Sequence, residues 1–277
     1  MLKRQKYFIL KKINTSFTRF YILLLALLFL NACNYFKKKE NYNKNIAKSS
    51  ILLLQKKPIP DSSTAGSQPQ FEVIFSKVEQ AMISNGCVDI NIIDSSIVVD
   101  LKYSTTDNFL GFDIYGDLNT CYLQTDVAEK LSHAQQILKS KFPFYNLIVY
   151  DGARPRMVQY KMWDSIAVPY NQRSLYLSNP SEGSLHNFGA AVDLSIIDKN
   201  GCVLDMGTPY DYFGELAYPR EEKRMIFEGK LSYKQLLNRE LLRSTMEIAG
   251  FTGITSEWWH FNSCSRREAF LKYLIIN

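Results

Sequence analysis

The pattern of apolar and polar positions divides the chain into three parts. A basic start leads into an unbroken apolar run at 21–30 (YILLLALLFL), and a polar, irregular stretch rich in Lys, Asn, Ser and Pro follows it. From about Phe71 onward, strand-like and helix-like patterns alternate at short intervals. The sequence therefore predicts one folded domain over 71–277, preceded by a flexible tether over 33–70 and a signal segment over 1–32.

Strands are predicted where β-branched and other apolar residues alternate or form short runs. Alternation over 88–103 (VDINIIDSSIVVDLKY) is typical of a pair of strands, and 146–150 (NLIVY) of a short buried strand. A further strand is expected over 190–198, and the turn residues Lys-Asn-Gly at 199–201 lead into its partner. A last strand begins within EWWHF at 257–261. The short turns favour antiparallel pairing.

Helices are predicted over 126–140, 156–167 and 233–251 from their apolar periodicity. Thr125 or Asp126 can cap the first helix. Four apolar side chains share one face of it: Val127, Leu131, Ala134 and Leu138. Because strands and helices are intermixed, we expect an α+β domain with a mainly antiparallel central sheet flanked by helices.

The excess positive charge of the chain lies before the apolar run, not in the predicted folded domain. The formal net charge is +6, but six of the 33 basic residues precede the apolar run. The remaining 27 equal the 27 acidic residues, so the body of the protein is neutral. Because no basic surface is left to attract nucleic acid, we expect no nucleic-acid partner.

The start of the chain has the features of an export signal. Basic residues, an apolar run of about ten residues and small residues after it form the secretory pattern, and the run is too short to span a bilayer comfortably. The sequence LNAC at 30–33 is similar to the lipobox of bacterial lipoproteins, which predicts cleavage before Cys33 and lipidation of this cysteine. An uncleaved signal anchor is the alternative. Either way, we expect a protein of the bacterial cell envelope, attached to the membrane and facing the periplasm or the exterior.

Four cysteines remain after the predicted signal: Cys87, Cys121, Cys202 and Cys264. In an oxidising compartment an even number is compatible with two disulfides, and four cysteines allow three connectivities. The sequence does not choose among these connectivities, and free buried thiols are a fair alternative.

Two histidines of the folded domain each have a carboxylate at a defined spacing. His186 precedes Asp193 by seven residues in SLHNFGAAVDLS, and Gly189 between them allows a sharp turn. His260 follows Glu257 by three residues in SEWWHF. Two imidazoles and one carboxylate, with a fourth position left for water, form a ligand set typical of catalytic zinc rather than of calcium or magnesium. We therefore predict a zinc site on the sheet, bound by His186, Asp193 and His260.

Glu257 is predicted to act on the zinc-bound water without binding the metal. In a regular strand an odd separation puts two side chains on opposite faces, so we expect Glu257 at the start of the strand, before the pleat is established. From there its carboxylate can take a proton from the water and pass it to the leaving amine. Trp258 and Trp259 would form walls of the site. His133, which has no acidic or histidine partner nearby, is interpreted as a structural histidine.

These motifs also resemble a known family. HNFGAAVD followed by EWWH resembles the zinc D-alanyl-D-alanine dipeptidases of the vancomycin-resistance type, which belong to the wider group of murein-cleaving zinc peptidases. Four further stretches match the dipeptidase pattern in order: DLKYSTTDNFLG (100–111), YDGARP (150–155), DMGTPYD (205–211) and LLRSTMEIAGF (241–251). The resemblance covers about 88–262 and extends well beyond the proposed ligands.

The resemblance implies roles for individual residues. One zinc ion per chain would be held by His186, Asp193 and His260, with Glu257 as general base and acid. Arg154 of the Gly-Ala-Arg-Pro turn would stabilise the oxyanion of the scissile carbonyl, since a fixed cation lowers the free energy of developing negative charge. A structural salt bridge is the alternative for Arg154.

The resemblance also implies contacts to the two ends of a dipeptide. Tyr103 and Asp211 match the contacts to the substrate ammonium group, and Ser184 matches a serine that contacts the substrate carboxylate. Asp205 is expected to belong to a turn. Leu185 departs from the family, because some members have a second serine there, and a side-chain hydroxyl contact is lost with it.

The implied activity is zinc-dependent hydrolysis of the dipeptide D-Ala-D-Ala in the cell envelope, by attack of zinc-bound water on the peptide carbonyl. The alternative within the same zinc group is a D,D-carboxypeptidase or murein endopeptidase that acts on longer peptides. A non-catalytic, peptidoglycan-binding lipoprotein is an alternative from another class, disfavoured because all the proposed ligands and Glu257 are present. An exported enzyme would not reach cytoplasmic dipeptide pools, so scavenging of released dipeptides is the expected role.

Overall fold

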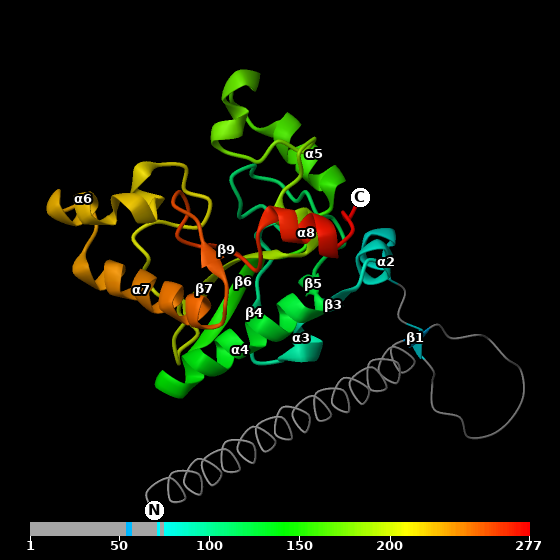
Figure 1. Ribbon diagram of the computed structural model, residues 1–277, viewed down its shortest axis with the longest axis horizontal. Helices are drawn as coiled ribbons and strands as arrows, with labels where there is room; N and C mark the ends of the chain where they lie inside the picture. The colour runs from blue at the N-terminus through cyan, green and yellow to red at the C-terminus, as the bar shows by residue number, and fades with distance from the viewer. Residues whose placement is uncertain (1–53, 57–70, 73–74) are drawn as a thin grey trace, which may run out of the picture. The chain divides into compact units, whose positions relative to one another are not determined.

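The computed structural model describes residues 54–56, 71–72 and 75–277, which fall into two units (Figure 1). The first unit contributes an antiparallel pair of short strands, β1 (Leu54–Lys56) and β2 (Phe71–Glu72). The second unit, 75–277, contains all the other described elements. The predicted signal segment and Cys33 lie outside the described residues, so their prediction stays untested.

The second unit is built on a five-stranded sheet with the strand order β4-β6-β7-β9-β8. In that order the strands span Val98–Val99, Asn146–Asp151, Ala191–Ile197, His260–Asn262 and Thr252–Gly253. β4 and β6 run parallel, whereas the other three neighbouring pairs are antiparallel. The α+β prediction is confirmed, and the sheet is mixed: most of its strand pairs are antiparallel, as expected, and the β4–β6 pair is parallel.

Helices and a second, smaller sheet surround the five strands. β3 (Cys87–Asp89) pairs antiparallel with β5 (Tyr122–Gln124). The α-helices are α2 (Lys77–Ser84), α3 (Ile90–Ile93), α4 (Thr125–Lys141), α5 (Arg156–Ser165), α6 (Glu222–Phe227), α7 (Tyr233–Ile248) and α8 (Arg266–Lys272). Short 3₁₀ helices are η1 (Lys102–Ser104), η2 (Tyr170–Leu175), η3 (Leu185–Phe188), η4 (Glu215–Ala217) and η5 (Pro219–Glu221). None of the described helices is both long and apolar enough to cross a bilayer.

The two faces of β7 differ in what they carry. Val192, Leu194 and Ile196 alternate onto one face and join the main core, which also contains Leu131 and Leu138 of α4. α4 packs along α7 and against β6 (Figure 1). Truncating one such buried leucine to alanine typically costs about 2–5 kcal/mol. Packing on this face therefore fixes the position of the strand, and the opposite face, called the site face below, is free to carry polar groups.

The prediction over 88–103 is only partly right. The region contains β3 and β4, but they belong to different sheets, and the helical turn α3 separates them. The side chain of Asp89 accepts a hydrogen bond from the N–H of Asn91 at 2.8 Å, and this cap starts the helical turn. The two predicted strands are therefore present, and the capped helical turn between them leads into a different sheet.

Other predicted boundaries need smaller corrections. The turn at 199–201 forms, but the expected partner strand is reduced to one bridge between Ile197 and Val203. Thr125 begins α4 rather than capping it, since Gln124 occupies the cap position. The four cysteines after the predicted signal are all described, and each is a free thiol in the structure, so the alternative of unpaired thiols holds there.

Candidate metal centre and active site

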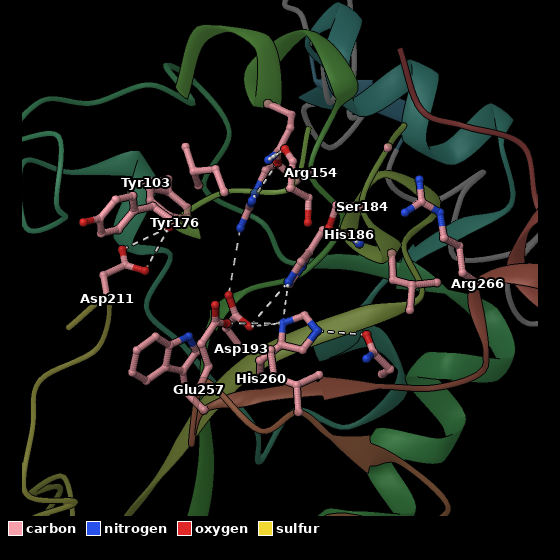
Figure 2. A pocket seen from close by; sticks show the side chains of 18 of the residues that line it. Tyr103, Arg154, Tyr176, Ser184, His186, Asp193, Asp211, Glu257, His260 and Arg266 are labelled. Atoms are coloured by element: carbon pink, nitrogen blue, oxygen red, sulfur yellow. Dashed lines mark hydrogen bonds and ion pairs between the residues drawn. The ribbon is translucent and has the colours of Figure 1, made fainter. Parts of the chain in front are cut away.

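A cavity of about 260 Å³ opens on the site face of the sheet (Figure 2). Eight side chains with an assigned role line it: Tyr103, Arg154, Ser184, His186, Asp193, Asp211, Glu257 and His260. In Figure 2 Tyr103 and Asp211 lie at the left, Ser184 and His186 lie together right of centre, and His260 lies below them. Drug-sized ligands occupy pockets of about 300–1,000 Å³, so this volume suits a smaller molecule.

The register of three strands places three site residues in one row across the sheet. Asp193 of β7 lies opposite His260 of β9 on one side and opposite Asp151 of β6 on the other. Residues directly opposite each other in antiparallel strands project to the same face. A bulge between Val149 and Asp151 shifts the register by one residue. Without this bulge Asp151 would point into the core, so the bulge brings a carboxylate into the site.

His186 reaches the same place from the short helix η3, just before β7. Gly189 ends this helix with φ of 65°, a left-handed conformation that glycine adopts without strain. A side chain there would also approach the sulfur of Cys87 to 3.0 Å. The sharp turn expected at Gly189 is therefore present, and it directs His186 back over Asp193.

Three ligand atoms converge from these residues. Nε2 of His186 lies 3.2 Å from Nδ1 of His260 and 3.4 Å from Oδ1 of Asp193, while Nδ1 of His260 lies 2.9 Å from the same Oδ1. In the described part of the chain, these three residues form a group of His and Asp side chains whose ligand atoms all lie within 4.8 Å of one another, close enough to share one ion. The three predicted ligands are thus brought together on the sheet.

The second nitrogen of each imidazole determines what the first can do. Nδ1 of His186 lies 2.8 Å from the carbonyl oxygen of Gly152, and Nε2 of His260 lies 2.8 Å from Oδ1 of Asn262. Because these oxygens only accept, the distal nitrogens carry the hydrogens. In the neutral form of each ring the inward nitrogen presents a lone pair, and together with Asp193 the two rings then place three acceptors around one point. This donor set fits a metal cation, which would satisfy all three.

The electrostatics of the site also attract positive charge. Burial opposes the charged form of His260, yet the hydrogen bond and charge of Asp193 outweigh it and raise the pKa of His260 to about 9. Burial likewise opposes the charge of Asp193, but His186 and His260 hold the pKa of Asp193 well below its usual range. The same charge distribution that draws a proton here would draw a metal ion.

Glu257 lies beside this cluster and outside the strand. It precedes β9, and its Oε2 lies 4.0 Å from Nδ1 of His260. Burial raises the pKa of Glu257, although the neighbouring histidines oppose this. A carboxylate with a raised pKa near a reactive centre is suited to proton transfer at neutral pH.

Arg154 is held by a buried network. Its Nε donates to Oδ2 of Asp151 at 2.9 Å, Nη2 pairs with the same oxygen, and Nη1 donates to Oε1 of Gln159 at 2.8 Å. Guanidinium has five N–H groups, so two remain available where Arg154 lines the cavity. The structural salt bridge considered as the alternative is therefore present, and it leaves donors free for a ligand.

Tyr103 and Asp211 meet at one end of the cavity although 108 residues separate them in sequence. The hydroxyl of Tyr103 donates to both carboxylate oxygens of Asp211, at 3.1 and 3.0 Å. Asp211 has φ of 58°, the one positive φ among the described non-glycine residues, at a cost of about 1–3 kcal/mol. Burial and the charge of Asp193 raise the pKa of Asp211 well above its ordinary range. An acidic group held this way is suited to a cationic ligand, which would stabilise its charged form.

Ser184 lines the cavity beside His186. Its Oγ accepts from the N–H of His186 at 3.3 Å, which leaves the hydroxyl hydrogen free to donate. The tryptophans differ: Trp259 lines the cavity, whereas the Nε1–H of Trp258 donates to Oγ1 of Thr208 at 2.7 Å. The expectation that both tryptophans wall the site is thus correct only for Trp259.

Several residues that support the site were missed from the sequence. Asp151, Asn262 and Tyr210 all touch assigned residues, and the hydroxyl of Tyr210 donates to Oδ2 of Asp193 at 3.0 Å. Asn262 could have been found, because it follows His260 by two residues in a predicted strand and must share its face. Asp205 lies in a turn, as expected, where Oδ1 accepts from the N–H of Gly207.

Comparison with known proteins agrees with the family suggested by the motifs. A D-alanyl-D-alanine dipeptidase of Escherichia coli (strain K12) is 32% identical over 174 residues, 63% of this chain and 82% of that protein. One of Enterococcus faecium is 29% identical over 177 residues, 58% and 83% of the two chains. A solved Zn(II) complex of a D,D-pentapeptidase from a VanB-type vancomycin-resistance cassette aligns with a TM-score of 0.33 and 15% identity, over 55% of this chain and 79% of that one. The family model described as D-ala-D-ala dipeptidase matches residues 83–272, and the chain therefore belongs to this family of M15 peptidases.

Proposed function

We propose that this chain is a zinc metallopeptidase that hydrolyses the free dipeptide D-Ala-D-Ala. One observation carries the proposal: a metal-binding trio and an acidic group, Asp211, lie in the same small cavity. The trio suits hydrolysis of a peptide bond, and the acidic group suits the free ammonium end of a dipeptide. The names of the curated relatives give the same substrate.

His186, Asp193 and His260 would hold one zinc ion, which when bound supplies a Lewis acid that lowers the pKa of water and polarises the scissile carbonyl. Glu257 takes a proton from the attacking water and delivers it to the nitrogen of the leaving D-alanine. Its position beside His260 but outside the ligand trio supports this role. Trp259 excludes bulk water from the cavity, which strengthens charge interactions within it.

Arg154 stabilises the negative charge that develops on the carbonyl oxygen. Its two remaining N–H groups are available for this purpose, because Asp151 and Gln159 engage the other three. The buried salt bridge to Asp151 holds the guanidinium before substrate arrives, and a preorganised donor of this kind contributes about 2.7–4 kcal/mol to transition-state stabilisation.

The two ends of the dipeptide are bound at the two ends of the cavity. Asp211 accepts the ammonium group together with Tyr103, and the Ser184 hydroxyl donates to the carboxylate. A longer stem peptide carries an amide where the dipeptide carries an ammonium, and would leave Asp211 buried without a charged partner. Such an unpaired group costs about 1–3 kcal/mol or more. This supports a dipeptidase over the carboxypeptidase or endopeptidase alternative.

An assay of the zinc-loaded protein on four substrates tests the proposal. We expect release of D-alanine from D-Ala-D-Ala, and little release from N-acetyl-D-Ala-D-Ala, D-Ala-D-Ala-D-Ala or a murein pentapeptide. Efficient cleavage of the pentapeptide would instead support the carboxypeptidase. Binding without cleavage of any substrate would support the non-catalytic lipoprotein.

The proposed enzyme acts in the bacterial cell envelope, anchored through a lipid on Cys33. The apolar run and the LNAC sequence support this location. In a bacterial host, we expect wild-type protein to partition with membranes and to incorporate labelled fatty acid, and Cys33→Ser to lose the label. Membrane-bound Cys33→Ser protein with an uncleaved N-terminus would support the signal anchor instead.

A further inference from the structure

Three side chains of α7 donate hydrogen bonds to Asp205 and Met206, which directly precede the 207–215 segment that carries Asp211. Gln235 Nε2 donates to Oδ2 of Asp205 at 2.9 Å, and Asn238 Nδ2 donates to the Asp205 carbonyl oxygen at 2.8 Å. Arg239 Nε donates to the carbonyl oxygen of Met206 at 2.7 Å. Their spacing of three and four residues places all three on one face of the helix. The sequence pattern predicts no role for any of them.

Arg239 differs from the other two because it holds both ends of the segment. Its Nη2 donates to the carbonyl oxygen of Leu216 at 2.9 Å, in addition to the bond from Nε to Met206. One guanidinium therefore bridges the two ends of the 207–215 segment. The side chain is among the largest that are fully buried in the described residues, so water does not compete for these carbonyls.

The packing around the start of this segment is equally close. Gly207 has φ of 84°, and a side chain there would approach Cδ1 of Leu231 to 2.5 Å and Cδ of Gln235 to 3.3 Å. Between the two ends, Asp211 takes the positive φ described above. An uncommon backbone conformation persists when its surroundings determine it from several sides. The bridge from Arg239 supplies such a constraint at both ends.

We propose that Arg239 is a positioning residue for substrate binding, which fixes the 207–215 segment so that Asp211 faces the cavity beside Tyr103. This inference rests on the proposed dipeptidase function for its kinetic readout. Without the bridge the segment ends separate, Asp211 relaxes towards ordinary backbone angles, and its carboxylate is no longer held for the substrate ammonium. The affinity for the dipeptide falls. The hydrogen bond from Tyr210 of this segment to Asp193 weakens as well, but Asp193 and His260 are fixed by strand pairing, so the proposed metal ligands keep their geometry.

Arg243 provides a matched control on the same helix. Glu222 is buried and pairs with Arg239 at 3.5 Å and with Arg243 at 2.6 Å. Within the described part of the chain, the hydrogen bonds of Arg243 go to Glu222, and none goes to residues 206–216. Removing either arginine disturbs the same buried charge, but only Arg239 bonds to the segment. A difference between the two variants therefore reports the bridge rather than general loss of stability.

The kinetic test compares Arg239→Met with Arg243→Met, well below the unfolding temperature of both. We expect Arg239→Met to raise KM for D-Ala-D-Ala by about tenfold or more, with kcat within about threefold of wild type. Arg243→Met should leave KM within about twofold. Arg239→Lys keeps the charge beside Glu222 but lacks the planar fork, so its KM should be intermediate. If Arg239→Met does not fold, Arg239→Lys takes its place in the comparison with Arg243→Met. Equal KM changes in Arg239→Met and Arg243→Met would overturn the proposal.

A double variant shows whether Arg239 acts through Asp211. In an Asp211→Asn background, Arg239→Met should raise KM little further, because the contact it positions is already lost. Full additivity of the two effects would overturn the proposal. Hydrogen exchange of the 207–215 amides gives a readout that needs no activity, with faster exchange expected in Arg239→Met than in Arg243→Met. Absence of wild-type hydrolysis would overturn the proposed function alone, whereas unchanged exchange would overturn the bridge alone.

Discussion

The two ends of the cavity are built in different ways. The proposed metal-binding end rests mainly on strands: Asp193 and His260 are direct neighbours across β7 and β9, Asp151 completes their row, and His186 comes from η3 just before β7. The end proposed to bind the substrate ammonium group rests on connecting segments, with Tyr103 in η1 and Asp211 in the stretch between β7 and α6. One end is positioned by backbone hydrogen bonds of a sheet, and the other by individual side-chain contacts.

In the proposed mechanism, the residues that act on the peptide bond and the residues that bind the substrate ammonium group are therefore held by different parts of the fold. Backbone hydrogen bonds between strands fix the relative positions of side chains that lie in one row across a sheet. This suits metal ligands, which must converge on one point. Loops held by a few contacts can be changed without disturbing that row, and they are where binding specificity usually resides. We therefore expect substitutions at the proposed metal-binding end of the cavity, called the strand end below, to affect zinc content and kcat. Substitutions at the proposed ammonium-binding end, called the loop end, should affect KM.

The largest effect is expected for His186→Ala, which removes one of three metal ligands. Loss of a ligand leaves two, too few for a stable zinc site, so both bound zinc and dipeptide hydrolysis should fall to background. Metal analysis of the purified protein measures the first and D-alanine release the second. His133→Ala is the control. Because His133 is exposed on α4, this variant should keep both bound zinc and dipeptide hydrolysis. Stoichiometric zinc in His186→Ala would sink the ligand assignment.

Glu257→Gln tests whether the strand end contains a group that acts on protons without binding metal. The amide has the same shape but does not accept a proton, so kcat should fall by about 10²–10⁴-fold. Zinc content should stay at the wild-type level, because Glu257 is outside the ligand trio. Loss of zinc together with activity would show instead that Glu257 is a ligand.

The sequence predicted the strand end of the site better than the loop end. The spacing of His186 and Asp193, and the position of His260 in a strand, were enough to group the three ligands. Periodicity likewise predicted α4 and α7 to within a few residues. These features depend on local pattern, because a ligand pair seven residues apart or an apolar helix face is determined by nearby residues.

What the sequence could not supply depends on long-range register. Asp151 enters the site only through the bulge at β6, and no local pattern marks a bulge there. The Tyr103–Asp211 contact joins segments 108 residues apart, so it came from resemblance to a family rather than from the residues themselves. The bridge from Arg239 was missed for the same reason, since a helix arginine is ordinarily exposed.

Asn262→Leu should have a smaller effect at the strand end. Asn262 accepts a hydrogen bond from Nε2 of His260, which keeps the lone pair of Nδ1 directed inward. Loss of such a supporting contact typically lowers metal affinity by about 10–100-fold. Titration with a competing chelator measures this affinity, and saturating zinc should restore most of kcat. Unchanged zinc affinity would mean that the sheet alone orients His260.

The smallest effect on zinc content and kcat, and the sharpest test of the comparison, is expected for Asp211→Asn at the loop end. The amide oxygen can still accept from Tyr103, but it carries no charge for the substrate ammonium, and a hydrogen bond to a charged group contributes about 1.5–3 kcal/mol. Because this contact is made in the ground state and the transition state alike, KM should rise by about tenfold or more while kcat changes little. Zinc content should not change. The variant should also discriminate less between D-Ala-D-Ala and its N-acetyl form, because the ammonium no longer has a charged partner. A fall in kcat as large as the rise in KM would mean that the two ends of the cavity are not separable, and that Asp211 also takes part in the chemistry at the metal-binding end.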